Sequence, residues 1–151
     1  MRPLTLAPTL TWVDRQALQV HSVDFIFQGE TATSNVANDI GSNGAVQCQV
    51  TDLNRGTLVF ADDRSLVASG VLTIDPDAYF TMSSDLYPDN YGKGSDDGRF
   101  VVNDQLYIAA NTTALTPAQA INITVRVNAS IVTLSAKDFM AIAIQSTAAD
   151  N

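Results

Sequence analysis

The feature that most constrains this chain is a run of strict alternation in its last third. Residues 121–131 read Ile-Asn-Ile-Thr-Val-Arg-Val-Asn-Ala-Ser-Ile, so every odd position is apolar and every even position is polar. Successive side chains of a β-strand point to opposite faces, and the pattern therefore predicts a strand with one dry and one wet face. At about 3.3 Å per residue this strand would span roughly 36 Å, which is long for a strand. Such a strand favours a β-sandwich or a barrel.

The composition supports an all-β domain independently of the alternation. Glu30 is the single glutamate among the 16 acidic residues, and the others are aspartates. Aspartate favours turns and caps, whereas glutamate and lysine are the residues that build exposed helix faces. A chain of 151 residues is large enough to bury a core as one domain without disulfides. The lone cysteine, Cys48, alternates with Val46 and Val50 and is expected to pack as a small apolar side chain.

Turn signals divide the chain into roughly seven or eight expected strands, the pattern of an antiparallel β-sandwich. The expected strands cover residues 18–27, 45–53, 57–60, 66–74, 78–82, 99–110 and 121–134, the sixth broken at Asn103-Asp104. The alternation slips at His21 and Ser22, which predicts a β-bulge there. Gly70 predicts a bulge or a close packing contact. In the second strand Thr51 is expected to point outward with Gln47 and Gln49.

The two ends of the chain differ from this pattern. Residues 136–145 fit a short helix or a final strand, and the helix is favoured because Ser135 and Asp138 are spaced like a capping box. Residues 1–16 are expected to form an extended arm, with residues 17–151 as the single sandwich domain. The arm either packs on its own domain or lies across a neighbouring subunit. Its apolar residues, the expected assembly contacts, are Leu4, Leu6, Leu10, Trp12 and Val13.

Several function classes are disfavoured by what the chain lacks. A net charge of −8 argues against nucleic-acid binding, which needs clustered Lys and Arg. No apolar run approaches the ~20 residues of a membrane span, and the N-terminal residues do not resemble an export signal. With one histidine and one cysteine, and no Gly-x-Ser-x-Gly, the sequence offers no zinc site and no nucleophile elbow. We therefore expect no enzyme.

The acidic loop at residues 75–98 offers two binding hypotheses. A calcium ion would find hard oxygen ligands there, and no other cofactor is expected. The candidate ligands are Asp85, Asp89, Asn90, Asp96 and Asp97. Exposed aromatic residues could stack a sugar, the candidates being Tyr87 and Tyr91 in the loop, Tyr79 in the short strand expected at 78–82, and Trp12 in the N-terminal arm. The alternatives are a hydrated loop without a metal, and tyrosines that pack the loop onto the sandwich.

A family resemblance starts at Asp104-Gln105-Leu106-Tyr107-Ile108. This segment is followed by the alternating strand through Val125-Arg126-Val127 and by the closing segment Val-Thr-Leu-Ser-x-x-Asp-Phe at residues 132–139. Over roughly residues 100–145 the order resembles the C-terminal half of single jelly-roll capsid proteins of viruses. The resemblance implies a jelly-roll sandwich and a function in the virion.

The function expected from these observations is that of a virion structural protein, as a capsid, decoration or spike component. It would act by self-assembly with copies of itself and other virion proteins. Many viral coat proteins neutralise the genome with a basic arm, and this chain has none, so no direct genome contact is expected. The alternative is a carbohydrate-binding or other surface-binding β-sandwich module, with calcium as its metal.

Overall fold

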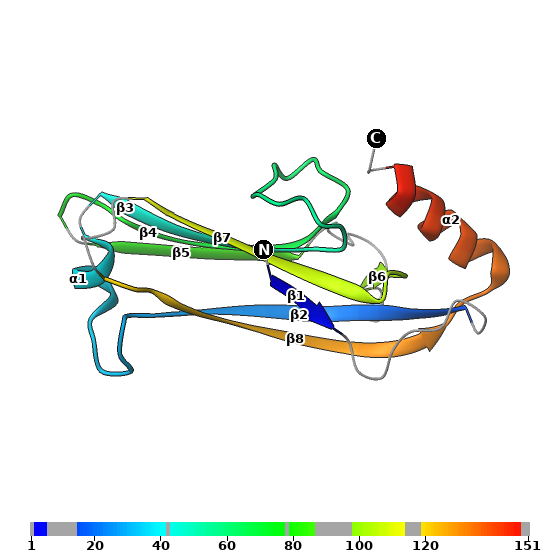
Figure 1. The fold of residues 1–151 in the computed structure, drawn as a ribbon, viewed down its shortest axis with the longest axis horizontal. Coiled ribbons are helices and arrows are strands. Elements are labelled where there is room, and N and C mark those ends of the chain that lie inside the picture. The colour runs from blue at the N-terminus through cyan, green and yellow to red at the C-terminus, as the bar shows by residue number, and fades with distance from the viewer. Residues whose placement is uncertain are drawn as a thin grey trace.

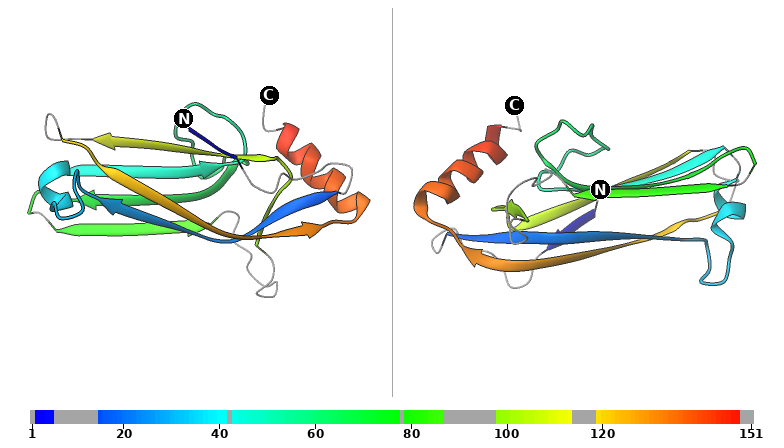
Figure 2. Two further views of the ribbon diagram at one scale, coloured as in Figure 1. Left: turned by 60° about the horizontal axis from the view of Figure 1, so that its bottom comes forward. Right: turned by 180° about the vertical axis from the view of Figure 1, so that it is seen from behind.

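The computed structural model describes residues 2–5, 15–41, 43–77, 79–86, 98–113 and 119–148, with side chains for residues 15–144 of these ranges. Two antiparallel sheets face each other, one of five strands in the order β1-β7-β3-β4-β5 and one of three in the order β6-β2-β8. Figure 2 shows β2 and β8 crossing the larger sheet obliquely. The prediction of an antiparallel β-sandwich is therefore confirmed.

The elements follow the predicted strands with several shifts. The strands are β1 (Arg2–Thr5), β2 (Gln16–Gln28), β3 (Gly44–Thr51), β4 (Leu66–Ile74), β5 (Phe80–Leu86), β6 (Arg99–Val101), β7 (Gln105–Thr113) and β8 (Asn122–Thr133), and the helices are α1 (Val36–Ile40) and α2 (Ala136–Ala148). Because β3, β4 and β5 follow one another as neighbours in a single sheet, the jelly-roll connectivity is not confirmed. The backbone of β1 pairs with β7 of the same chain, while the domain division after residue 16 stays a prediction.

The main core lies between the two sheets and is built from alternating strand residues. Val46, Cys48 and Val50 of β3 are fully buried, as their alternation predicts. Phe25 of β2 is 3% exposed and faces Gly70 of β4, where an added Cβ would lie 2.6 Å from the Phe25 ring. The close contact predicted at Gly70 is therefore present, and it sets the local spacing between the sheets.

Strand β8 confirms the dry and wet faces predicted from the alternation at residues 121–131. From Asn122 to Ser130 its even residues are exposed and its odd residues are half-buried. The odd residues are only half-buried because β8 ends the three-stranded sheet and has one neighbour among the described strands, β2. The bulge expected near His21 is also present, as the register between β2 and β8 shifts between Val20 and Ser22.

Two strand predictions were wrong, and a third strand is present with shifted limits. Residues 57–60 form part of a loop, in which the backbone of Val59 exchanges two hydrogen bonds of 2.8 Å with the side-chain amide of Gln49. This side chain takes the place of a neighbouring strand. Residues 99–110 form two strands, because the chain crosses between the sheets after Val102, and β6 pairs with β2 while β7 pairs with β3. The strand expected at 78–82 lies instead at Phe80–Leu86.

Thr51 was predicted to point outward and is instead fully buried. The register of β3 against β4 shifts between Val50 and Thr51, which breaks the alternation at the last residue of the strand. The hydroxyl group of Thr51 donates a hydrogen bond of 2.8 Å to the carbonyl oxygen of Leu53. Burial of this polar side chain is therefore tolerated because its donor is satisfied.

The helices close opposite ends of the sandwich (Figure 1). At one end Ile40 of α1 is fully buried in a cluster with Val46 and Ile74. At the other end α2 confirms the helix favoured for residues 136–145. Ser135 caps it, since its hydroxyl oxygen accepts from the backbone N–H of Asp138 at 3.2 Å and its O–H donates to the Asp138 carboxylate at 2.7 Å. Phe139, on the inner face of α2, is buried in a cluster with Ala17 and Val102.

Candidate functional site

A buried ion pair joins the end of β3 to β6. Arg99 Nη2 lies 3.1 Å from Asp52 Oδ2, with the two side chains 17% and 6% exposed. Arg99 also donates to the carbonyl oxygen of Arg64, and Asn103 donates to the carbonyl oxygen of Asp52 at 2.7 Å. In the part of the chain that the structure describes, Asp52 Oδ1 and Arg99 Nε have no hydrogen-bond partner. Burial raises the pKa of Asp52, and the charge of Arg99 offsets only part of this effect. The contacts of Arg99 connect β6 to the end of β3 and to the loop at Arg64.

A second polar cluster closes the loop between β3 and β4. Asp63 Oδ1 accepts from the Ser65 backbone N–H at 2.9 Å and from its hydroxyl group at 2.7 Å. Arg55 Nη2 lies 3.2 Å from Asp63 Oδ2. Burial alone would raise the pKa of Asp63, but the hydrogen bonds from Ser65 and Arg55 outweigh it and lower the pKa below 3.8. The ionised carboxylate therefore holds this loop together.

The lowered pKa of Asp63 predicts a specific acid sensitivity. A depressed pKa in the folded state adds stability above the unfolded value of 3.8, and this stability is lost as the pH falls through the folded pKa. We expect Asp63→Asn to lower the free energy of unfolding by about 1–2 kcal/mol at pH 7. The difference from the wild type should shrink below pH 3.8. Urea denaturation across this pH range measures it, with the exposed neighbour Asp62→Asn as control. A difference that does not depend on pH would contradict the assignment.

A serine and the single histidine meet on the exposed surface. His21 Nε2 lies 2.9 Å from Ser130 Oγ, a distance at which a histidine can activate a serine. Activation also needs a group that orients the imidazole and donors for an oxyanion. Neither is recorded at this pair among the described residues, and His21 lies at the β2 bulge on an exposed face. The pair is best explained as a cross-strand contact that fixes the bulge.

The remaining candidates for chemistry are buried or dispersed. Burial raises the pKa of the Cys48 thiol to about 11, so the group stays protonated at neutral pH and is a poor nucleophile. Within the described ranges, no group of three or more His, Cys, Asp or Glu side chains could hold a metal ion.

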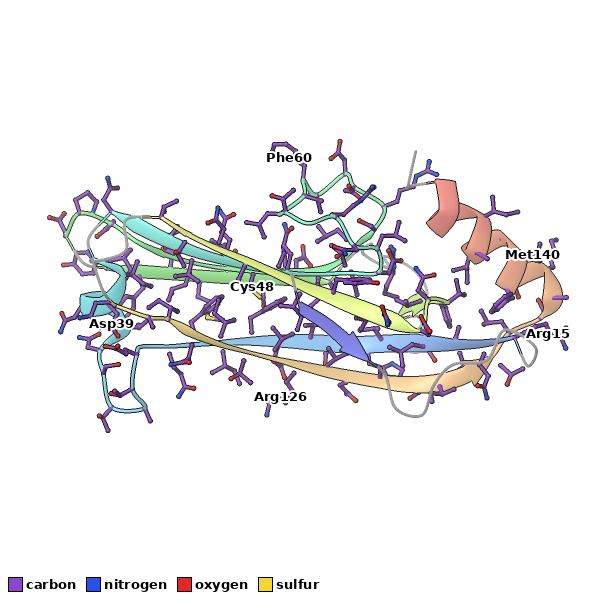
Figure 3. All side chains as sticks on the ribbon, in the orientation of Figure 1. Arg15, Asp39, Cys48, Phe60, Arg126 and Met140 are labelled. Carbon is purple, nitrogen blue, oxygen red and sulfur yellow. The ribbon has the colours of Figure 1, made fainter. Side chains whose placement is uncertain are left out.

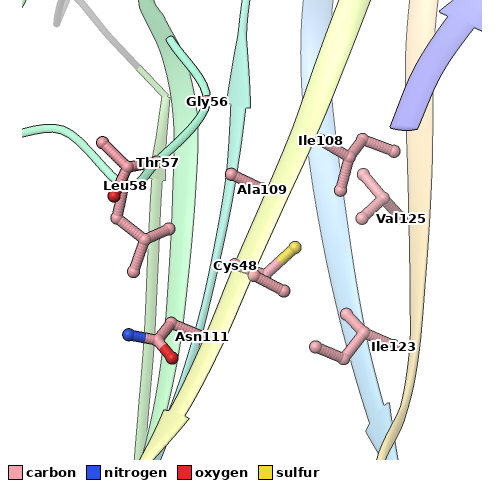
Figure 4. A pocket seen from close by; sticks show the side chains of 10 residues that line it. Cys48, Gly56, Thr57, Leu58, Ile108, Ala109, Asn111, Ile123 and Val125 are labelled. Atoms are coloured by element: carbon pink, nitrogen blue, oxygen red, sulfur yellow. The ribbon is translucent and has the colours of Figure 1, made fainter. Parts of the chain in front are cut away.

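A hollow of about 500 Å³ borders β7. Figure 4 shows that its lining lies on both sides of this strand. Ile108, Ile123 and Val125 line it between the sheets, whereas Thr57 and Leu58 line it over the outer face. The hollow therefore extends around β7 and is not a single enclosed cavity between the sheets. Its lining contains no charged side chain, so it offers no general acid or base for catalysis.

Among the described residues, large apolar side chains that are more than half exposed lie at three places. On and beside β5, Tyr79, Phe80 and Met82 are 73%, 57% and 52% exposed. On the outer face of α2, Met140 and Ile144 are exposed, one helical turn apart. Phe60 stands alone at the tip of a loop and is 87% exposed. Figure 3 shows Phe60 and Met140 pointing away from the sandwich.

The exposure of Phe80, Met82, Met140 and Ile144 is not evident from the sequence. Phe80 and Met82 alternate as core residues do, and only their place on an edge strand leaves them exposed. Met140 and Ile144 belong to a stretch of apolar residues in which the sequence does not indicate the buried side of the helix. In the structure the buried side is formed by Phe139 and Ala143. An i, i+4 pair opposite a buried face was the signal that could have found them.

Most residues selected from the sequence lie outside the described part of the chain. Of the calcium candidates only Asp85 is described, on β5, where its exposed carboxylate accepts from the backbone N–H of Leu86 at 2.9 Å. The other four calcium candidates, Asp89, Asn90, Asp96 and Asp97, lie outside the described residues, as do the sugar-stacking candidates Tyr87 and Tyr91. Of the arm residues only the backbone of Leu4 is described, paired with Leu106. The remaining four, Leu6, Leu10, Trp12 and Val13, also lie outside the described residues.

Neither helix in the described ranges is long and apolar enough to cross a membrane. In comparisons with protein-family models, curated proteins and solved structures, nothing matches this chain.

Proposed function

We propose that this protein is a virion structural component, a capsid, decoration or spike subunit that acts by self-assembly. The observation that carries the proposal is the apolar surface formed by Phe80 and Met82, which lie two residues apart on one face of β5 and are 57% and 52% exposed. A single exposed apolar side chain is ordinary, but neighbouring ones on an edge strand mark an interaction surface. The exposed pair Met140 and Ile144 on α2 supplies a second surface, and two separate contact surfaces suit a subunit held in a larger assembly.

Charge and chemistry support the rest of the proposal. A net charge of −8 disfavours genome contact, so the proposed subunit binds other protein subunits. Its polar clusters, Arg99–Asp52 and Arg55–Asp63, stabilise loops, and the proposed role is not enzymatic. The jelly-roll connectivity implied by the family resemblance remains a prediction, and the self-assembly proposal rests on the exposed surfaces.

Self-assembly is tested by measuring mass in solution. We expect the wild type to form multimers whose mass by multi-angle light scattering rises with concentration, with regular particles in electron micrographs. Phe80→Ser with Met82→Ser should shift the protein toward smaller species because it removes the apolar β5 surface. The isolated Phe60→Ser is the matched control and should leave the mass unchanged. A wild type that stays monomeric at millimolar concentration would overturn the proposal.

A further inference from the structure

The free edge of β8 is a second feature that bears on assembly. Across the described residues β8 pairs with β2 along its whole length, from Asn122 to Thr133. It is the last strand of the order β6-β2-β8, so no described strand occupies its other edge. Figure 1 shows it as the outermost strand of the smaller sheet. A row of backbone donors and acceptors is thus available for pairing with another strand.

This edge lacks the devices that usually prevent pairing. Soluble proteins protect a long edge strand with proline, lysine, an inward-pointing charge or a bulge that twists it away. β8 contains no proline and no lysine. Its one charge, Arg126, is already paired with Asp24 at 3.1 Å on the neighbouring strand. Ile131, which shares the inner face with Val127, is 41% exposed. An edge with these properties needs a cover.

We propose that a second copy of this chain covers the edge, through antiparallel pairing of β8 with its own copy about a two-fold axis at Val127. The inference rests on the proposed self-assembly and names the contact. The apolar inner row runs from Ile123 to Ile131 and is centred on Val127. With the axis there, Val125 faces the partner's Ala129, and Ile123 faces the partner's Ile131. Every apolar residue of the row then meets an apolar residue.

The outer row selects the same register. With the axis at Val127, Arg126 faces the partner's Asn128 and Thr124 faces the partner's Ser130, so no like charges meet. An axis at Arg126 would place two guanidinium groups opposite each other, which is unfavourable. An axis at Asn128 would place Ile123 opposite the partner's Thr133 and break the apolar match. A two-fold axis makes the contact self-complementary, as closed dimers require.

The test uses the cross-strand pair that Arg126 forms with the partner's Asn128. The two-fold axis makes this pair occur twice in each dimer. Asn128→Lys places like charges together and should raise the dimer dissociation constant by about 2- to 30-fold, as expected for two cross-strand pairs. Asn128→Asp places opposite charges together and should lower it by a similar factor, with the gain reduced at high salt. Sedimentation velocity at low salt measures both. The control is Gln47→Lys, which makes the same change of charge at an exposed position on β3.

The outcomes separate this inference from the proposed function. Unchanged circular dichroism of the Asn128 variants establishes that they fold, and opposite shifts in the dissociation constant then support the β8 contact. An oligomer insensitive to both Asn128 variants overturns the β8 contact and leaves self-assembly standing. If Leu10→Ser with Trp12→Ser dissociates that oligomer, the N-terminal arm and not β8 makes the contact between subunits. A monomeric wild type overturns both.

Discussion

Phe25→Ala is expected to lower the free energy of unfolding by about 3–5 kcal/mol, as is usual when a buried phenylalanine is truncated. Phe25 is 3% exposed and belongs to the main core between the sheets. Its ring packs against Gly70, so alanine would leave a cavity that the neighbouring backbone can fill only by moving. Domains are stabilised by about 5–15 kcal/mol in total. Urea denaturation followed by circular dichroism measures the loss.

The contact with Gly70 gives this prediction a second readout. Gly70→Ala alone should cost about 1–3 kcal/mol, because the new Cβ would overlap the Phe25 ring. In the Phe25→Ala background the same methyl group partly fills the cavity, so the double variant should lose less than the sum of the two. Phe60→Ala removes the same ring from an 87% exposed site and should change stability by less than about 0.5 kcal/mol. Additive losses at positions 25 and 70 would contradict the packing described.

Arg99→Leu is the second substitution with a large expected effect, a loss of about 3–5 kcal/mol at pH 7. It would leave the carboxylate of Asp52, 6% exposed, without its counter-charge. Burial already raises the pKa of Asp52, and loss of Arg99 should raise it further. A raised carboxyl pKa means that the folded state binds the proton more tightly, so stability falls as the pH rises above the unfolded value of 3.8. The loss should therefore be smaller at pH 4 than at pH 7.

The exposed pair Arg126–Asp24 provides the matched comparison. Its side chains are 69% and 53% exposed, and Arg126→Leu should cost about 0–1 kcal/mol because solvent screens the pair. Adding Asp52→Asn to Arg99→Leu removes the stranded charge and should restore part of the loss. Equal losses for the two arginine substitutions, or a loss at position 99 independent of pH, would show that Asp52 does not depend on Arg99.

The sequence predicted those parts of the fold that depend on local patterns. The alternation of β8, the bulge beside His21, the limits of β4 at Leu66–Ile74 and the Ser135 cap of α2 all appear as expected. Each depends on side-chain direction or backbone geometry within a few residues, and neighbours in the sequence report on these directly.

Contacts between distant segments decided the rest. Val59 reads as a strand residue, yet its backbone partner is the side chain of Gln49. Asp52 and Arg99 are 47 residues apart, and neither reads as half of a buried pair. Of the binding residues proposed from the sequence, only Tyr79 and Asp85 have described side chains, whereas the apolar surface at Phe80 and Met82 was read as ordinary strand.

By itself the sequence determined an antiparallel β-sandwich with a capped C-terminal helix, because periodicity fixes which side chains share a face. Only the tertiary structure decided which strand stands at an edge, since pairing joins residues that are far apart in the chain. The run at residues 121–131 shows the difference. Its alternation predicted a dry face and a wet face, and its place at the end of the smaller sheet left the dry face half covered. That incomplete cover follows from strand order, and it makes β8 a candidate for contact with a second copy.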